Sequence, residues 1–186
     1  MYKRQNVNRV SADSRVEIFG QTGNDSFNVG STRDANNGNL NLLRGELFIG
    51  GGANTAGDDM LQINDAGAGF APFGYSITDR LFASRDPGFS RPFTGINFNS
   101  IELVFATGAS LASNTFFVTP STEAVIRVDG NDQTGNIRDE LFVNANPNNA
   151  ELRQGANSDN GFFEFSNGLR NVSFQAIDRA VIDLEV

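Results

Sequence analysis

The feature that most constrains the fold is a series of short apolar runs separated by glycine, asparagine, aspartate and proline. Within these runs apolar and polar residues alternate, as in MLQI at 60–63 and VIRV at 125–128. Alternation with a period of two, in segments rich in Val, Ile and Phe, indicates half-buried β-strands. Helical periodicity is nearly absent. The sequence therefore predicts an all-β fold with strands at residues 16–18, 26–29, 40–42, 46–49, 60–63, 75–77, 95–98, 116–118, 125–128, 140–143, 163–165, 172–174 and 181–184.

Several of these segments occur twice in the same order. Residues 95–106 (GINFNSIELVFA) match 171–182 (NVSFQAIDRAVI), and residues 46–65 resemble 125–144. NDSFNV, ending at Val29, resembles SNTFFV, ending at Val118, and GYSIT at 74–78 resembles FFEFS at 162–166. We therefore expect a unit of roughly 75–95 residues to occur twice.

The repeats divide the chain into β-rich unit 1 at 7–100, β-rich unit 2 at 101–176, and the start of a third unit or a terminal strand at 177–186. Because the chain begins and ends at about the same phase of its repeat, we expect a two-unit excerpt of a longer array. Such an array fits a parallel β-solenoid or β-helix-like stack of two imperfect repeats, with apolar ladders inside and Asn, Gly and Asp at the corners. The alternative is a string of tandem β-sandwich modules.

Composition excludes several classes of function. The chain has no Cys and no His, which removes disulfides, thiolate metal sites, ordinary zinc sites and Ser-His-Asp triads. A net charge of −8 argues against nucleic acid as a partner. No apolar run is long enough for a membrane span. An acidic, Cys-free chain with a single lysine is typical of bacterial extracellular repeat proteins, so we expect an extracellular or cell-surface location.

The stretch GQTGNDSFN at 20–28 carries the most specific motif. Gly20, Gly23, Asp25 and Phe27 match the form G-G-x-G-x-D-x-U-x, where U is apolar, and Gln21 departs from it. The stretch thus resembles the nonapeptide of RTX, or haemolysin-type, calcium-binding repeats, within the repeat region of a large bacterial surface protein. The resemblance implies calcium held between stacked turns.

Further Asp-containing turns extend this hypothesis. The candidate metal ligands share a position in a glycine-rich turn before a strand, and they are Asn24, Asp25, Asp58, Asp59, Asp129, Asp132 and Asp139. The competing interpretation is structural, with each aspartate accepting backbone N–H groups at a corner.

We expect a non-enzymatic structural module, in a surface layer, fibre or adhesin stalk, that associates end to end with other copies or neighbouring repeats and is stabilised by Ca²⁺. One alternative is a calcium-dependent module that binds glycan or protein through the long segment 66–95, which is either a projecting patch or a hairpin packed over the sheets. The other is a β-helix enzyme acting on acidic polysaccharide through paired carboxylates.

Overall fold

The computed structural model describes residues 3–30, 37–53, 58–69, 73–85, 93, 95–131, 138–145 and 147–183. Its described elements are β1 (Lys3–Val7), β2 (Arg15–Phe19), β3 (Asp25–Val29), β4 (Glu46–Gly50), β5 (Met60–Asn64), β6 (Phe73–Ile77), β7 (Leu81–Ser84), β8 (Ile96–Asn99), β9 (Leu103–Thr107), β10 (Asn114–Val118), β11 (Val125–Asp129), β12 (Glu140–Asn144), the 3-10 helix η1 (Pro147–Asn149), β13 (Ala150–Gln154), β14 (Gly161–Phe165), β15 (Val172–Gln175) and β16 (Arg179–Asp183). The prediction of an all-β fold is confirmed.

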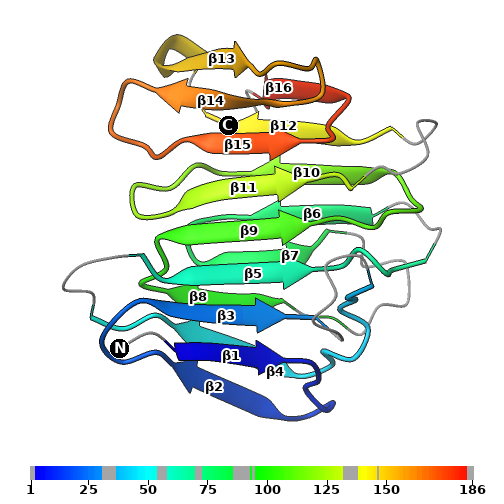
Figure 1. Cartoon of the computed structure of the whole chain (residues 1–186), viewed down its shortest axis with the longest axis vertical. Coiled ribbons are helices and arrows are strands. Elements are labelled where there is room, and N and C mark those ends of the chain that lie inside the picture. The colour runs from blue at the N-terminus through cyan, green and yellow to red at the C-terminus, as the bar shows by residue number, and fades with distance from the viewer. Residues whose placement is uncertain are drawn as a thin grey trace.

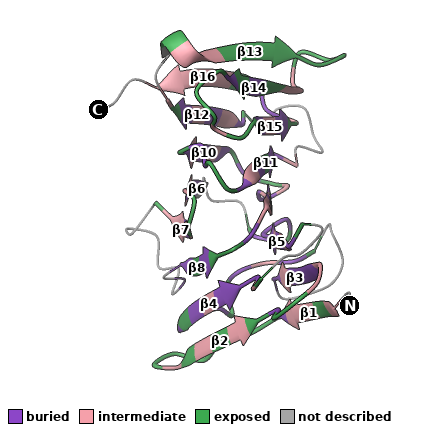
Figure 2. Cartoon of the chain, turned by 90° about the vertical axis from the view of Figure 1, so that its left-hand side faces the viewer, coloured by how far each residue is buried: buried purple, intermediate pink, exposed green. Residues whose placement is uncertain are grey.

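The strands form two mixed sheets that lie face to face along the long axis of the molecule (Figures 1 and 2). The first sheet has the order β1-β3-β5-β9-β11-β15-β14-β13, and the second has the order β16-β12-β10-β6-β7-β8-β4-β2. Most neighbouring pairs are parallel, while β14 is antiparallel to β13 and β15, and β7 is antiparallel to β6 and β8. Both sheets contain strands from both halves of the chain, which separate tandem sandwiches would not produce.

The chain moves from one sheet to the other after almost every strand. Two excursions interrupt this alternation. Strands β6, β7 and β8 follow one another within the second sheet, and β13, β14 and β15 follow one another within the first. In each excursion the first strand, β6 or β13, lies two positions farther along its sheet than the last strand. Two antiparallel steps then bring the chain back, so the last strand, β8 or β15, pairs with the earlier strand β4 or β11 (Figure 1).

The core consists of two continuous apolar rows that face each other between the sheets. In the first sheet, strand pairing aligns Phe27, Leu61, Val104, Ile126, Val172 and Phe163, and in the second it aligns Leu47, Ile96, Phe82, Ile77, Val118 and Val143. All of these side chains are at most 1% exposed. Because burial of one such side chain contributes about 1.5–3 kcal/mol, these rows account for much of the stability.

Aromatic stacking contributes to this core. The Tyr75 ring lies between Phe82 and Phe116, with centroid distances of 5.6 and 5.1 Å. The Tyr75 hydroxyl donates a 2.8 Å hydrogen bond to Asp65 Oδ2, and both residues are buried. The polar end of the buried tyrosine is therefore satisfied within the core.

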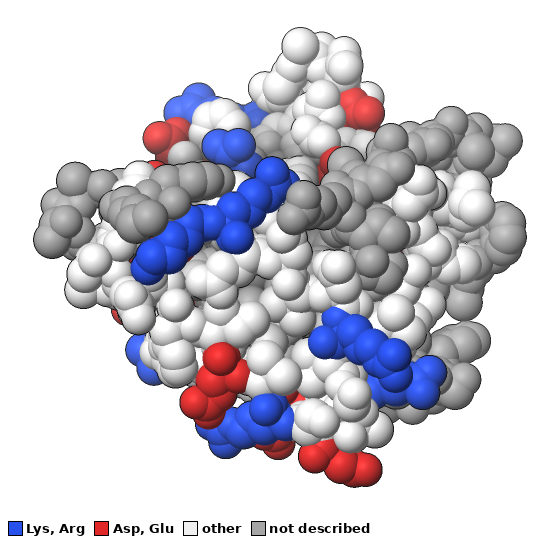
Figure 3. All heavy atoms as spheres, turned by 60° about the horizontal axis from the view of Figure 1, so that its bottom comes forward, with Lys and Arg blue, Asp and Glu red and all other residues white. Residues whose placement is uncertain are grey.

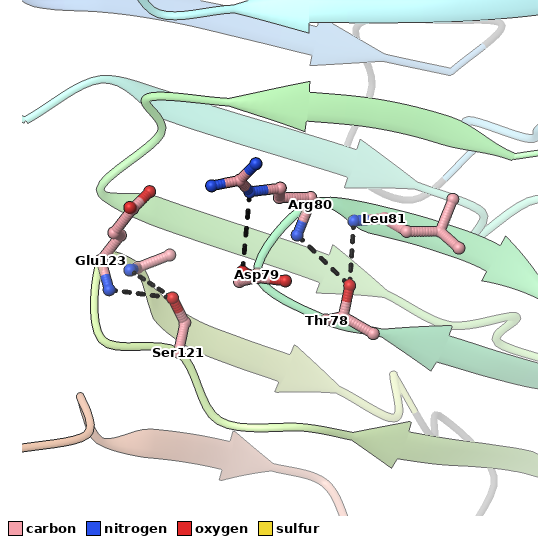
Figure 4. Close-up of polar contacts among 7 residues, drawn as sticks. Thr78, Asp79, Arg80, Leu81, Ser121 and Glu123 are labelled. Carbon is pink, nitrogen blue, oxygen red and sulfur yellow. Dashed lines mark hydrogen bonds and ion pairs between the residues drawn. The ribbon is translucent and has the colours of Figure 1, made fainter.

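Hydroxyl side chains hold two of the turns (Figure 4). Thr78 Oγ1 accepts the backbone N–H groups of Arg80 and Leu81 between β6 and β7. Ser121 Oγ accepts those of Glu123 and Ala124 before β11. These local bonds replace the sheet hydrogen bonds that the backbone loses where it reverses.

The structure resolves the predictions for segments 40–42 and 66–95 differently. The prediction of a strand at 40–42 is wrong, because Leu43 N–H bonds back to the Leu40 carbonyl and closes a turn that still buries both leucines. Part of the segment 66–95 forms the hairpin of β6 and β7 inside the second sheet, and residues 70–72, 86–92 and 94 lie outside the described part of the chain.

Candidate functional site

Three of the aspartates predicted as metal ligands occupy equivalent positions at the N-terminal ends of strands. Asp25 is the first residue of β3, Asp59 immediately precedes β5, and Asp139 immediately precedes β12. All three are at most 1% exposed. Each follows a connection between the two sheets that begins with a glycine, Gly20, Gly51 or Gly130, directly after or at the end of the preceding strand.

The carboxylates link successive levels of the stack through backbone amides. Lys3 N–H donates to Asp25 Oδ1 over 2.9 Å, and Asp25 N–H donates to Asp59 Oδ1 over 2.6 Å. Asp59 N–H in turn donates to Glu102 Oε2 over 2.7 Å. Carboxylate acceptors form stronger hydrogen bonds than neutral groups do, so this column fixes the position of one corner on the next.

A second column has the same construction at a corner nearer the C-terminus. The backbone N–H and the Nδ2 group of Asn114 both donate to Asp139 Oδ1, over 2.6 and 2.9 Å. Asp139 N–H donates to Asp178 Oδ2 over 2.8 Å. Asn114 is fully buried and occupies the place in this column that Asp25 occupies in the first.

Close approach of the carboxylates explains the glycines in the motif. A Cβ atom at Gly20 would lie 2.5 Å from Asp25 Oδ2, and one at Gly130 would lie 2.5 Å from Asp139 Oδ2. Gly51 stands in the same relation to Asp59. An added Cβ would lie still closer to a backbone carbonyl oxygen, that of Gly51 for Gly20, of Ser100 for Gly51 and of Ala176 for Gly130. Any larger residue would therefore displace both the backbone of the next turn and the buried carboxylate.

The structure divides the predicted metal ligands into two groups. Asn24, Asp25, Asp58 and Asp59 lie at neighbouring corners near the N-terminal end, where Asp58 is exposed. Asp129 and Asp139 flank the turn between β11 and β12, and Asp132 lies outside the described residues.

Of the described carboxylates in this set, those of Asp25, Asp59, Asp129 and Asp139 accept hydrogen bonds from protein groups. Asp129 accepts Asn131 N–H with Oδ1 and the Gln175 side-chain amide with Oδ2, over 2.9 and 2.6 Å. Among the described residues no group of three or more acidic side chains is arranged to hold a metal ion. Calcium binding stays a prediction, and the observed contacts are those of the structural interpretation.

The two ends of the stack form a second candidate site. Within the described chain, β1 and β2 are the outermost strands at one end, and β13 and β16 are the outermost strands at the other. Inward-facing residues of these edge strands are incompletely covered. Leu152 on β13 is 39% exposed, while Val16, Ile18, Ala180 and Ile182 are half-buried (Figure 2).

The ends also differ in charge. Residues 3–19 contain four basic and two acidic residues, a net charge of +2 in a chain of −8. Residues 147–183 contain three basic and five acidic residues, a net charge of −2. Figure 3 brings the N-terminal end forward and shows basic side chains spread across it.

Sequence reasoning missed β1, β7, β9 and β13 as strands. Of these, β1 and β13 are polar, with sequences KRQNV and AELRQ. Charges on either side of a single leucine, as in Glu151-Leu152-Arg153, are the signal that could have identified β13, because edge strands commonly carry charged residues.

No family model, curated protein or solved structure matches the chain. The described residues contain no helix with the length and hydrophobicity that crossing a membrane requires.

Proposed function

We propose that the chain is a structural module of an extracellular bacterial repeat protein and associates end to end with further copies or units. The observation that carries this proposal is that both sheets finish in open edges at both ends of the long axis, within the described chain. An open edge presents unpaired N–H and C=O groups that a further strand can satisfy. The proposed architecture is a β-solenoid-like stack of two imperfect units.

The order of connections supports the two-unit architecture. Residues 25–107 (β3 to β9) comprise three strands that alternate between sheets, a three-strand excursion and one further strand. Residues 114–183 (β10 to β16) repeat this order with the two sheets exchanged. Each unit crosses between the sheets four times and so ends in the sheet where it began, and the further crossing from β9 to β10 starts the second unit in the opposite sheet.

The same order indicates where a third unit would attach. The first strand of the second unit, β10, pairs in parallel with β6, which begins the first excursion. The corresponding strand of the second excursion is β13, which is the last strand of its sheet in the described chain. A following strand from another unit or another copy would therefore pair with β13 as β10 pairs with β6.

Strand direction is compatible with such growth. Two antiparallel steps from β15 leave β13 running in the same direction as β1, and two such steps within the second sheet leave β16 parallel to β2. A second copy placed on the C-terminal end without inversion would continue both sheets in parallel. This head-to-tail contact is heterologous, so it generates an open filament or a ring.

Sedimentation velocity on the full chain over a range of concentrations tests the proposal. We expect linear oligomers that grow with concentration and dissociate as salt is raised, because the ends carry opposite charge. Leu152→Lys should weaken association by at least about tenfold, since it places a charge at the exposed core of the edge. Leu111→Lys is the matched control, because Leu111 is also 39% exposed but lies between β9 and β10.

Two results would contradict end-to-end association. One is a chain that stays monomeric at millimolar concentration. The other is equal loss of association in the Leu152→Lys and Leu111→Lys variants, which would move the contact away from the ends. Circular dichroism of both variants verifies that they remain folded.

A further inference from the structure

A groove crosses the outer face of the first sheet near its C-terminal end. Its volume is about 700 Å³. Strand β11 contributes Val125 and Arg127, β14 contributes Phe162, and the connection from β14 to β15 contributes Leu169 and Arg170. The groove lies on the side of the sheet away from the core, so its side chains can contact a ligand without any rearrangement of the apolar rows.

The groove is cationic in an acidic protein. Arg127 and Arg170 are both exposed, and neither makes an ion pair with another described residue. By contrast, Arg153 on β13 and Arg179 on β16 are paired with Glu164 and Glu140. The lining contains no acidic side chain. Two guanidinium groups without carboxylate partners are suited to bidentate binding of carboxylates.

The rest of the lining is partly apolar and partly hydroxylic. Phe162 is 36% exposed and faces outward from β14. Thr122, Asn171 and Ser173 add two hydroxyl groups and a carboxamide. A ring that is exposed beside hydrogen-bonding groups and cations matches a ligand with an apolar face, hydroxyls and negative charge.

We propose that this groove binds a uronate-containing acidic polysaccharide. Carboxylates of neighbouring uronate residues bind Arg127 and Arg170, and the C–H face of one sugar ring packs on Phe162. The hydroxyls hydrogen-bond to Thr122, Asn171 and Ser173. The lining offers no carboxylic acid pair for general acid–base hydrolysis of a glycosidic bond, so the role inferred for the groove is binding. The inference does not depend on end-to-end association, because the groove lies within one copy.

Isothermal titration calorimetry of the full chain with tetragalacturonate, in the presence of a chelator, tests this inference. The chelator removes any binding that calcium would bridge. We expect saturable binding that weakens with salt, and no binding of the neutral maltotetraose. Arg127→Gln and Arg170→Gln should each lower the affinity by at least about tenfold, because each removes a charge-assisted contact. Phe162→Ala should lower it severalfold.

Arg9→Gln is the matched control for the arginine variants. It removes the same charge from an exposed arginine at the opposite end of the stack and should leave the affinity within about twofold. Thermal unfolding of each variant verifies that these surface substitutions leave the fold intact.

Three outcomes would overturn the inference. The first is no saturable binding of tetragalacturonate, and the second is binding that Arg127→Gln and Arg170→Gln leave unchanged. The third is binding of tetraglutamate as tight as that of the oligouronate, which would identify an acidic peptide as the ligand class. None of these outcomes bears on the sedimentation experiment, so the two proposals fail separately.

Discussion

Substitution of Asp59 by alanine separates the two interpretations of the corner carboxylates. Asp59 Oδ1 accepts the buried Asp25 N–H over 2.6 Å, and Asp59 is fully buried. Its neighbour Asp58 belongs to the same turn and the same predicted metal set but is exposed. The variants Asp59→Ala and Asp58→Ala therefore remove the same charge at adjacent positions. Only Asp59→Ala removes the acceptor of the Asp25 N–H group.

The expected loss of stability in Asp59→Ala follows from the Asp25 N–H group, which loses its acceptor. A buried N–H group that loses its acceptor costs about 1–3 kcal/mol. Removal of a buried carboxylate recovers part of its desolvation penalty, which offsets some of this loss. We expect Asp59→Ala to lower the free energy of unfolding by about 2 kcal/mol. With a urea m value of about 2 kcal/mol/M, the unfolding midpoint falls by about 1 M. Asp58→Ala should change the free energy by less than about 0.5 kcal/mol.

Urea unfolding followed by circular dichroism, once in a chelator and once in millimolar calcium, is the appropriate assay. If the carboxylate acts through backbone hydrogen bonds, the loss for Asp59→Ala is the same in both solutions. A different result would refute this reasoning. If both variants lose stability equally, and only when calcium is present, then the corner is a metal site and the hydrogen bonds are secondary.

Two further substitutions test the corner and the core. Gly130→Ala should cost about 1–3 kcal/mol in urea unfolding, because its Cβ would clash with the Ala176 carbonyl oxygen and lie 2.5 Å from Asp139 Oδ2. Gly69→Ala, with nothing within 4 Å, should be nearly neutral. Equal stability of these two variants would contradict the steric explanation. Tyr75→Phe removes the 2.8 Å hydrogen bond to Asp65 and should lower Tm by about 4 °C in a thermal melt. An unchanged Tm would mean that this bond contributes nothing to stability.

Strands with two different faces could be predicted from sequence, because alternation reports burial directly. In the predicted strand 60–63, Leu61 and Ile63 are fully buried while Gln62 is not. The corner aspartates Asp25, Asp59 and Asp139 and the glycine Gly20 were also identified. Their detailed role was not predictable, because the amides that the carboxylates accept belong to other levels, such as the Asp25 N–H bound by Asp59.

The edge strands β1 and β13 and the pairing order could not be predicted, whereas the edge strands β2 and β16 were. β1 and β13 are polar and lack the apolar alternation of the other strands. The similarity of GYSIT and FFEFS suggested equivalent strands, yet β6 pairs in parallel with β10, whereas β14 is antiparallel to both its neighbours. The alternation of apolar and polar residues shows which face of a strand is buried but not the direction of the strand. The excursions could therefore not be predicted from the sequence.

The charges on the edge strands select between two modes of association. Edge charges often prevent pairing, and Lys3 and Arg4 on β1 would do so between two identical ends, because a head-to-head contact brings the +2 ends together. A head-to-tail contact instead brings the +2 end to residues 147–183, which carry −2, at an edge strand, β13, whose Glu151 and Arg153 form an ion pair. The same residues that oppose head-to-head pairing therefore favour continued growth in one direction. Because both effects are screened by salt, high ionic strength should reduce head-to-tail association and remove the discrimination against head-to-head contacts.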